Sequence, residues 1–370
     1  MAQIISNFTQ LQIFKNLWFN SYSTIPKLSE ELSIDRSNIS RNLRRLLKHH
    51  LIKTGTEKEK TEKVGRKASI IQINEDKGYF IGVTITENSS TAFLTNFRLK
   101  IIQENVVEEN ITVDNLANIL IKTIRPFQSY FEKVICMAIA FPGEVDIEGK
   151  TPFFSKPLGL NESKKLNRIF QGKFQFPVYL ENDANAGAMY HFFLNRNDHP
   201  SNLVYSLLAI HFNSDKIMGY LGNGIIINKQ LYEGSNLFAG VSGEMFKILS
   251  ASNKIYDLDS LKKQLKKITS IENELNNFIN ESSNVISNII NLYDPSVYIL
   301  GGYIEIFPEK IQKKLIEEVK EKIVNFQARK HEIYVDKSLM RSAALGSCFS
   351  LINKFFNNLD VANKYLSKVV

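Results

Sequence analysis

The stretch YLENDANAG, residues 179–187, joins the end of an apolar run to a densely polar turn. Two carboxylates, Glu181 and Asp183, alternate with the amides Asn182 and Asn185 before small residues that are typical of a helix start. Ligands of open α/β sheets bind outside the carboxyl ends of the strands, so a strand that ends this way indicates a ligand site. The same residues also fit a polar strand end whose carboxylate caps the following helix. The sequence leaves both interpretations open at this point.

Strand and helix patterns alternate on both sides of this turn. Apolar strand-like runs occur in GYFIGVTIT, STAFLTNF, VICMAIAF, LVYSLLAIHF and VYILGGYI, and amphipathic helical stretches occupy 259–292 and the segment SAALGSCFSLINKFFNN. Repeated strand–helix units predict an α/β architecture for residues 76–370.

Composition narrows the class of protein. The chain has 370 residues, 44% of them hydrophobic and 23% charged, as in ordinary globular domains. Its two cysteines, Cys136 and Cys348, lie in apolar stretches outside any CxxC pair, which argues against a disulfide framework or a structural zinc site. The first residues do not resemble a signal peptide, and apolar runs such as the one from Asn202 are too short to span a bilayer. We therefore expect a cytoplasmic protein without a membrane segment.

Positive charge is concentrated at the N-terminus. Residues 1–70 contain 13 Lys or Arg and 6 Asp or Glu, so they supply +7 of the net charge of +8. A basic segment beside a nearly neutral body is the charge distribution that nucleic-acid binding requires, although a solvated surface would also account for it.

The first 50 residues have the pattern of a helix-turn-helix. Ser23 and Thr24 are suitable caps for a helix with Pro26 in its first turn, and Asp35 is a suitable cap for a second helix, RSNISRNLRRLLKHH. An earlier helix at about residues 8–20 supplies further core. The second helix combines an apolar stripe with a polar, basic face, which is the composition of a helix that enters the major groove of DNA. Ser33 occupies a turn position where glycine is common.

Two strands, LIKTG and SIIQIN, follow this helix pair, and the charged run between them reads as a wing. Within it, VGRKA forms a small basic hook that could enter a minor groove. The predicted DNA contacts are polar or basic side chains of the second helix and the hook: Arg36, Ser37, Asn38, Ser40, Arg41, Asn42, Arg45, Arg66 and Lys67. A helical protein-interaction domain with a solvated basic face is the alternative.

Taken together, these motifs resemble the ROK family of repressors and sugar kinases over nearly the whole chain. The resemblance rests on the winged helix with its GR pair at 65–66, AFPGEVDIEGK at 140–150, FPVYLENDANAGAMY at 176–190, GNGIIINKQLYEGSNLFAG at 222–240 and DPSVYILGGYI at 294–304. It implies a winged helix-turn-helix at 1–75 before a two-lobed, actin/hexokinase-like (ribonuclease H-like) domain. The implied small lobe spans 76–182 and 345–370, and the implied large lobe, with the ligand cleft and the oligomer contacts, spans 183–344.

The resemblance also suggests roles for individual residues. Asp183 matches the catalytic base of the family's kinases, Asn182 matches a sugar contact, and Glu181, Glu244 and Lys156 are further candidate ligand contacts. Glu244 stands where the family has a histidine, so it is either a new ligand contact or an exposed acid. Gly222, Gly224, Gly301 and Gly302 are expected in tight turns, with or without a nucleotide.

Other parts of the kinase machinery are altered. The family's kinases have an Asp-x-Gly-Gly turn in the first hairpin, whereas Thr84, Thr86 and Glu87 stand at these positions in VTITENSS. A glutamate there repels triphosphate, and non-glycine residues hinder close approach of the backbone. AGVSGEMFK lacks the family's sugar-binding Glu, with Val241 in its place, and no cysteine cluster follows it. We expect neither a zinc site, nor a cofactor, nor catalysis, with Asp183 as a vestigial base.

The sequence therefore predicts a repressor of carbohydrate-related genes that binds double-stranded operator DNA as a homodimer or homotetramer. Its body is expected to sense a sugar or sugar derivative. Two alternatives remain: an active ATP-dependent sugar kinase with an accessory DNA-binding domain, and a regulator whose body only dimerises or docks a protein.

Overall fold

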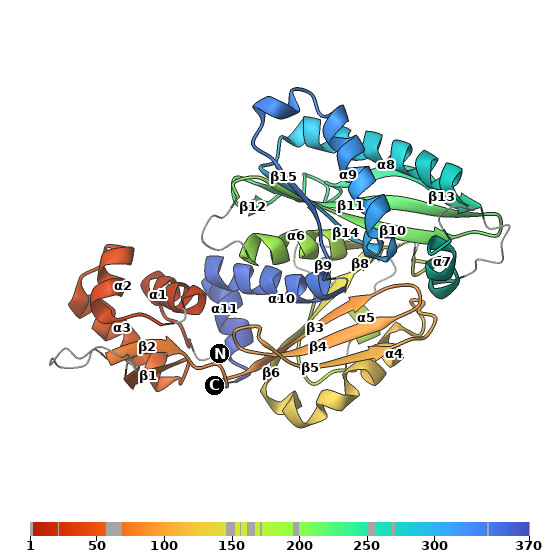
Figure 1. The fold of residues 1–370 in the computed structure, drawn as a ribbon. Coiled ribbons are helices and arrows are strands. Elements are labelled where there is room, and N and C mark those ends of the chain that lie inside the picture. The colour runs from red at the N-terminus through yellow and green to blue at the C-terminus, as the bar shows by residue number, and fades with distance from the viewer. Residues whose placement is uncertain are drawn as a thin grey trace.

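The computed structural model describes residues 3–20, 22–56, 69–145, 152–155, 157–160, 167–170, 172–194, 200–250, 257–267, 271–338 and 340–369. A small N-terminal domain lies beside a larger body made of two sheets with helices between and around them (Figure 1). The predicted α/β fold with an N-terminal winged helix-turn-helix and a two-lobed body is confirmed.

The N-terminal domain contains three helices and a hairpin: α1 (Phe8–Phe19), α2 (Ile25–Leu32), α3 (Arg36–Lys48), β1 (Ile52–Thr56) and β2 (Ser69–Ile73). The caps are those that the sequence predicts, because Thr24 accepts a hydrogen bond from the Lys27 amide and Asp35 accepts one from the Asn38 amide. Ser33 ends α2 in the left-handed region, with φ of 54°. This conformation explains why glycine is common at this turn position.

The first lobe is built on a five-stranded sheet in the order β5-β4-β3-β6-β9. Its strands are β3 (Tyr79–Ile85), β4 (Ser90–Asn96), β5 (Ile101–Val107), β6 (Val134–Phe141) and β9 (Val178–Asn182). Every residue of β6 is buried, as expected for a central strand that is covered on both faces. The outer face is covered by α4 (Leu116–Ile124) and η1 (Arg125–Lys133), and this lobe also contains β7 (Glu144–Val145), β8 (Pro152–Phe154) and α5 (Asn167–Phe170).

The second lobe has a sheet in the order β12-β11-β10-β14-β15, with β13 paired to β11. Its strands are β10 (Leu203–Phe212), β11 (Lys216–Ile227), β12 (Gln230–Leu231), β13 (Val241–Ser250), β14 (Val297–Gly302) and β15 (Glu332–Val335). Around this sheet lie α7 (Leu258–Leu265), α8 (Glu272–Tyr293), η4 (Tyr303–Ile306), α9 (Glu309–Lys322) and η5 (Phe326–Ala328).

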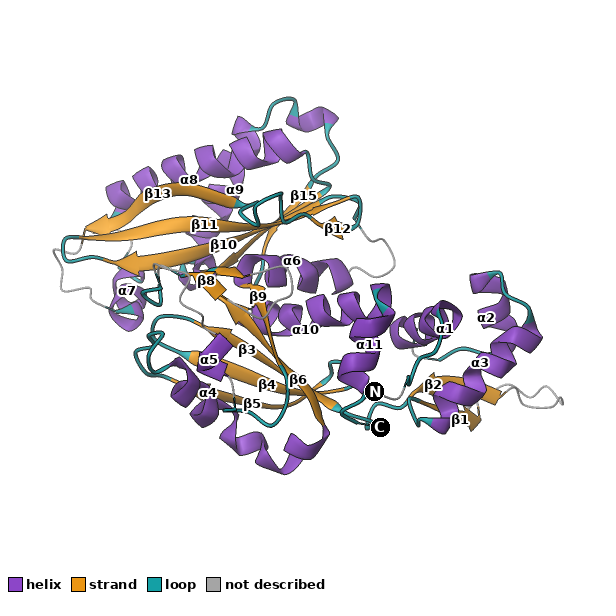
Figure 2. Cartoon of the chain, turned by 180° about the vertical axis from the view of Figure 1, so that it is seen from behind, coloured by secondary structure: helices purple, strands orange, loops and turns teal. Residues whose placement is uncertain are grey.

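Two central helices, α6 (Asp183–Leu194) and α10 (Met340–Asn357), lie side by side between the sheets (Figure 2). Glycines allow close contacts at three successive interfaces. A Cβ added to Gly82 of β3 would lie 2.5 Å from the carbonyl oxygen of Ala344, and one on Gly346 of α10 would lie 1.8 Å from that of Ala186. The third glycine, Gly224 of β11, faces α6 in the same way.

Gly222 and Gly224 lie inside β11 and Gly301 lies in β14, so the expectation of tight turns is wrong for these three glycines. Gly302, with φ of 72°, ends β14 where the chain turns into η4. The physical reason for Gly224 is the short distance between β11 and α6, and for Gly301 the ring of Tyr205, whose hydroxyl would lie 2.1 Å from an added Cβ.

The N-terminal domain shares its hydrophobic core with the body. Trp18 donates a hydrogen bond from Nε1 to the carbonyl oxygen of Phe97 at 3.0 Å, and the side chain of Asn363 in α11 (Leu359–Leu366) accepts from the amides of Ile4 and Ile5. Aromatic side chains fill the space between these polar contacts. The N-terminal domain is thus packed directly against the C-terminal helices.

Candidate functional site

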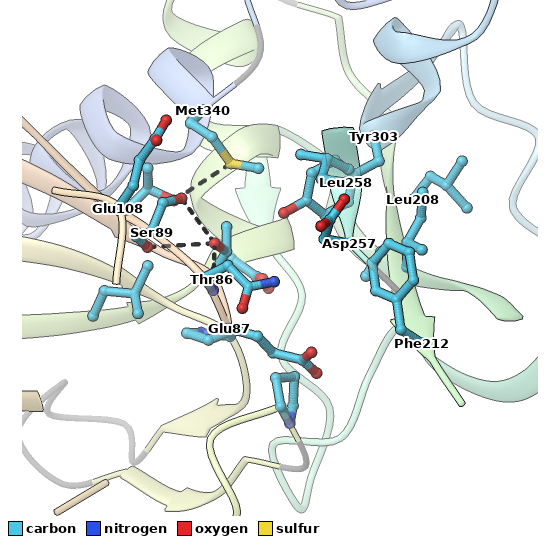
Figure 3. Close-up of a pocket in the computed structure, with 18 of the residues that line it drawn as sticks. Thr86, Glu87, Ser89, Glu108, Leu208, Phe212, Asp257, Leu258, Tyr303 and Met340 are labelled. Atoms are coloured by element: carbon cyan, nitrogen blue, oxygen red, sulfur yellow. Dashed lines mark hydrogen bonds between the residues drawn. The ribbon is translucent and has the colours of Figure 1, made fainter. Parts of the chain in front are cut away.

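A cavity of about 380 Å³ lies between the two lobes. One wall comes from the β3–β4 turn with Thr86 and Glu87, and the opposite wall from the second lobe with Phe212 and Tyr303 (Figure 3). Asp183 lines the cavity, so the strand end that the sequence singles out is brought to the cleft.

The backbone around Asp183 follows from the strand–helix junction. Asp183 is the first residue of α6, and its Oδ1 accepts a hydrogen bond from the Ala184 amide at 2.8 Å. Burial between the lobes raises the pKa of Asp183 to about 7, and the nearby carboxylate of Glu144 contributes in the same direction. The pKa of Glu144 is also raised to about 7 by burial. A carboxyl group with this pKa can bind or release a proton near neutral pH.

This raised pKa predicts a pH-dependent stability. A carboxyl pKa is near 4 in an unfolded chain, so between about pH 4 and 7 the folded chain binds more protons, and its stability falls as pH rises through that range. We expect Asp183→Asn to remove this contribution and to raise the free energy of unfolding at pH 8 by roughly 1–2 kcal/mol, with little change at pH 4. Chemical unfolding of both chains at the two pH values measures it. An equal difference at both would contradict the prediction.

Asn182 is engaged within the fold. Its Nδ2 donates to the carbonyl oxygen of Gly143 at 3.0 Å, and its Oδ1 accepts from the Asn185 amide at 3.0 Å. The side-chain oxygen of Asn182 therefore caps α6, and the bond between the Asp183 carboxylate and the Ala184 amide adds to this cap. Asn182 lies next to the cavity-lining Asp183 in the chain, but its own side chain does not line this cavity.

Glu181 points to a different part of the molecule. Its side chain is 4% exposed, and its Oε2 accepts hydrogen bonds from the hydroxyl groups of Tyr179, at 2.8 Å, and of Ser350 in α10. The structure thus separates Glu181 from Asp183, although the two are neighbours in the sequence. Glu181 lies beside α10 and does not line the cavity, contrary to the prediction that it contacts a ligand there.

Two other predicted ligand contacts cannot be placed. Lys156 lies outside the described residues. Glu244 belongs to β13, but the structure describes only its backbone. Both remain predictions from the sequence.

The β3–β4 turn, which the sequence predicts to be an altered phosphate turn, is closed by hydrogen bonds between its own residues. The hydroxyl groups of Thr86 and Ser89 lie 2.9 Å apart, and the Thr86 amide donates to the Ser89 carbonyl oxygen at 2.9 Å. Glu87 reaches across to the other lobe, where its Oε1 lies 3.3 Å from Nδ1 of His211. The side chains of Thr86, Glu87 and Ser89 thus fill this turn.

Sequence patterns did not reveal several residues of the cavity. Tyr220, Tyr303 and Met340 line it from β11, η4 and α10, and burial raises the pKa of both tyrosines. Tyr303 lies in the motif DPSVYILGGYI, but its place in the cavity, like those of Tyr220 and Met340, follows only from the packing of separate elements. The charged lining is mainly acidic and comprises Glu87, Glu108, Glu109, Asp183, Asp257, Asp259 and Lys262.

A second candidate site is the exposed face of α3. Arg36, Ser37 and Arg41 are exposed, as a DNA-reading face requires, and Asn38 and Ser40 are half-buried. Arg44 and Lys48 are exposed on the same helix and extend the basic face, although they are not among the DNA contacts predicted from the sequence.

Of the residues predicted for this face, Asn42 points inward and Arg45 bonds to the N-terminal segment beside α3. Asn42 is 6% exposed, and its Nδ2 donates to the side-chain oxygen of Asn38 at 2.7 Å. Arg45 donates to the backbone carbonyl oxygens of Gln3 and Ile4. The structure corrects the expectation for Asn42, because its position on the helix faces the domain core.

A basic groove of about 520 Å³ continues from α3 toward the N-terminal arm and is lined by Gln3, Arg41, Arg44, Arg45, Lys48 and His49. The pKa of His49 is lowered by burial and by the positive charges of Arg45 and Lys48. This concentration of positive charge favours a phosphate backbone. Arg66 and Lys67 of the predicted hook lie outside the described residues.

Among the described residues, no group of three or more His, Cys, Asp or Glu side chains is placed to hold a metal ion. The helices that the structure describes also include none with the length and apolar character needed to cross a bilayer.

Comparisons with known proteins agree with this architecture. Residues 80–255 match the ROK family model. The chain is 26% identical to the xylose repressor of Staphylococcus xylosus over 95% of this chain and 96% of that protein. It is 24% identical to the xylose repressor of Bacillus subtilis (strain 168), over 96% and 98%.

Solved structures share the fold. A ROK family transcriptional regulator, described as a homologue of the E. coli Mlc protein, superposes with a TM-score of 0.67 at 17% identity and covers 99% of this chain and 98% of its own. A ROK family glucokinase from Streptomyces griseus, solved with glucose and AMPPNP, has a TM-score of 0.55 at 16% identity over 73% of this chain and 98% of its own. Residues 80–255 of this chain therefore form a ROK family domain.

Proposed function

We propose that this protein is a DNA-binding transcriptional repressor of carbohydrate-related genes whose body senses a sugar without phosphorylating it. The observation that carries the proposal is a winged helix-turn-helix with an exposed basic α3, packed directly onto a ROK body. Its full-length relatives include proteins named xylose repressor, which favours D-xylose or a similar sugar as the effector. Operator DNA is the expected partner, and the cytoplasm is the expected location of such a regulator.

The DNA part of this proposal has a direct test. The full chain is expected to bind DNA flanking its own gene selectively in a gel-shift or footprint experiment, with affinity that falls steeply as salt rises, because lysine and arginine release counterions from phosphates. Binding that shows no sequence preference at moderate salt would contradict a repressor function. The same footprint reports the spacing of half-sites and therefore tests the proposed homodimer or homotetramer.

The cavity supports a sensor more than a kinase. Its charged lining is mainly carboxylates, and by the family resemblance Thr86 and Glu87 replace the phosphate-binding glycines of the kinases. Negative charge and bulky side chains at this turn both oppose ATP binding. A neutral sugar pays no such penalty and can hydrogen-bond to the carboxylates and to Tyr220 and Tyr303.

We therefore expect D-xylose or a related sugar to raise the melting temperature of the wild-type chain, whereas ATP with Mg²⁺ leaves it unchanged. A ligand that binds only the folded state stabilises it by mass action, at roughly 2.7 kcal/mol when its concentration is 100 times Kd. Asp183→Asn should weaken the sugar response because it removes a charged acceptor from the cavity wall. A panel of pentoses, hexoses and amino sugars in a thermal-shift assay measures this effect. A panel without any response would favour a body that only dimerises or docks a protein.

An active sugar kinase remains the second candidate because Asp183 is retained at the cavity with a pKa of about 7. ATP-dependent phosphorylation of any sugar in the panel, lost in Asp183→Asn, would establish that function in place of the sensor.

A further inference from the structure

The two central helices both begin at the cavity and end at the DNA-binding domain. Asp183 starts α6 and lines the cavity, and Met340 starts α10 and lies 3.9 Å, through its sulfur, from the hydroxyl of Thr84. At a rise of 1.5 Å per residue, the 18 residues of α10 extend for about 27 Å. Figure 1 shows its far end beside α1 and α11.

At that far end, aromatic rings connect the helices to α1. Phe193 of α6 stacks on Phe349 of α10, with centroids 4.9 Å apart, and also on Phe19 of α1, with centroids 5.4 Å apart and planes within 4°. Trp18 packs edge-on against Phe349 and Phe356. We call these five residues the aromatic clamp: Trp18, Phe19, Phe193, Phe349 and Phe356.

The central helices form one rigid unit. The close approach at Gly346, where the neighbouring atom is the backbone carbonyl oxygen of Ala186, leaves no space for independent sliding. Most residues of α10 are buried along its length. Because a close-packed core transmits displacement instead of absorbing it, a shift at the cavity end of either helix must reach the clamp.

Space for movement exists beside the clamp. A crevice of about 920 Å³ separates α1 and α2 from the β11–β12 turn and from α10, and Phe8, Lys15, Gln230 and Lys354 are among its lining residues. The crevice leaves space on this side of the shared core into which the DNA-binding domain can tilt about the clamp.

We infer that the aromatic clamp is the coupling element that converts closure of the cavity into a tilt of the winged helix, with Phe19 as the residue on the DNA-binding side that follows the central helices. The inference deepens the proposed function, on which its sugar-dependent part rests. By thermodynamic reciprocity, operator binding must then alter sugar affinity by the same factor as sugar alters operator affinity.

The first test requires no sugar. Met340→Ala perturbs the cavity end and Phe19→Ala the clamp, and operator affinity is measured for each single variant and for the double variant. Sites farther apart than about 10 Å with no shared partners normally act additively. We expect the pair to deviate from additivity by threefold or more in Kd. Additive behaviour would overturn the coupling, because it would show that α10 does not connect the two ends.

Phe8→Ala is the matched control. Phe8 lies on the same helix as Phe19 and lines the crevice, but its ring is 58% exposed and is outside the clamp. Its cycle with Met340→Ala should be additive within about 1.5-fold. The conservative Phe19→Leu should restore part of the coupling, because it refills apolar volume. Equal non-additivity for Phe8 and Phe19 would contradict a specific role of the clamp.

The second test uses Trp18, the single tryptophan of the chain, as a probe inside the clamp. D-xylose is expected to change Trp18 emission in the wild-type chain. In Phe19→Ala, D-xylose binding should persist within twofold by calorimetry, while its effect on operator affinity falls to less than one third of the wild-type factor. An unchanged effect in Phe19→Ala would overturn the inference. If D-xylose does not bind the wild-type chain, the sugar part of the proposed function fails. The double-variant cycle still decides whether the two ends of the central helices are coupled.

Discussion

A Gly224→Ala chain is expected to unfold at a much lower temperature than the wild type, with a loss of folding free energy of roughly 3 kcal/mol. The added Cβ would lie 2.2 Å from the carbonyl oxygen of Ala184 and 2.8 Å from the Cβ of Ala188. The two nearest conflicting atoms belong to the backbone of Ala184 in α6, and the Cβ of Ala188 has no rotamer to change, so no side-chain rotation can relieve the contact. The strand and the helix must move apart.

Gly222 of the same strand provides the matched control. An added Cβ at Gly222 would meet the Cβ of Ala184 at 3.5 Å, which is an ordinary van der Waals distance. Gly222→Ala should therefore leave the melting temperature within a few degrees of the wild-type value. Similar melting temperatures for the two variants would show that β11 and α6 are not held as closely as the structure indicates.

This substitution also has a functional consequence. Ala184 directly follows Asp183, so a displaced α6 start moves the carboxyl group that lines the cavity. A Gly224→Ala chain that still folds at low temperature should respond less to sugar than Gly222→Ala does, and the thermal-shift assay compares the two directly.

Arg41→Ala is expected to weaken operator binding by roughly tenfold to a hundredfold, the range for one arginine contact to a base or phosphate. Arg41 is exposed on α3 and also lines the basic groove beside it, whereas the helix positions behind it are buried in the domain core. The variant should fold normally because no core contact is lost. Fluorescence anisotropy with labelled operator measures the change.

The salt dependence of the same binding identifies the kind of contact. If Arg41 binds a phosphate, Arg41→Ala should reduce the magnitude of the slope of log K against log salt by about one and weaken binding to all sequences alike. If Arg41 contacts a base, Arg41→Ala should instead lower sequence specificity at one position of the operator. Arg125→Ala is the charge-matched control, since Arg125 is exposed on the first lobe of the body. Equal losses for Arg41 and Arg125 would place the DNA interface elsewhere.

Much of the N-terminal domain was predictable because its signals are local. Thr24 and Asp35 cap helices that begin within a residue of them, and the apolar spacing of α3 defines its buried stripe. Whether a given side chain of α3 points toward solvent or toward the core was less predictable. Asn42 has the chemistry of a base-reading side chain, yet its amide bonds to Asn38 inside the domain.

The strand–turn–helix at residues 179–187 shows the same division. Alternating apolar and polar residues determined that β9 ends and α6 begins there, since these features depend on neighbours in the chain. Only the tertiary structure decided that Asp183 lines the cavity while Glu181 lies buried against Ser350, because these environments are supplied by elements far away in sequence.

The sequence by itself therefore determined the order of the elements, the basic face of α3 and the Thr84, Thr86 and Glu87 side chains at the first hairpin. The tertiary structure decided which side chains share a cavity, that Glu87 meets His211 across the lobes, and that α6 and α10 join the cavity to Trp18 and Phe19. Caps, turns and periodicity depend on residues within a few positions of each other, whereas these contacts depend on how whole sheets and helices pack, which no short stretch encodes.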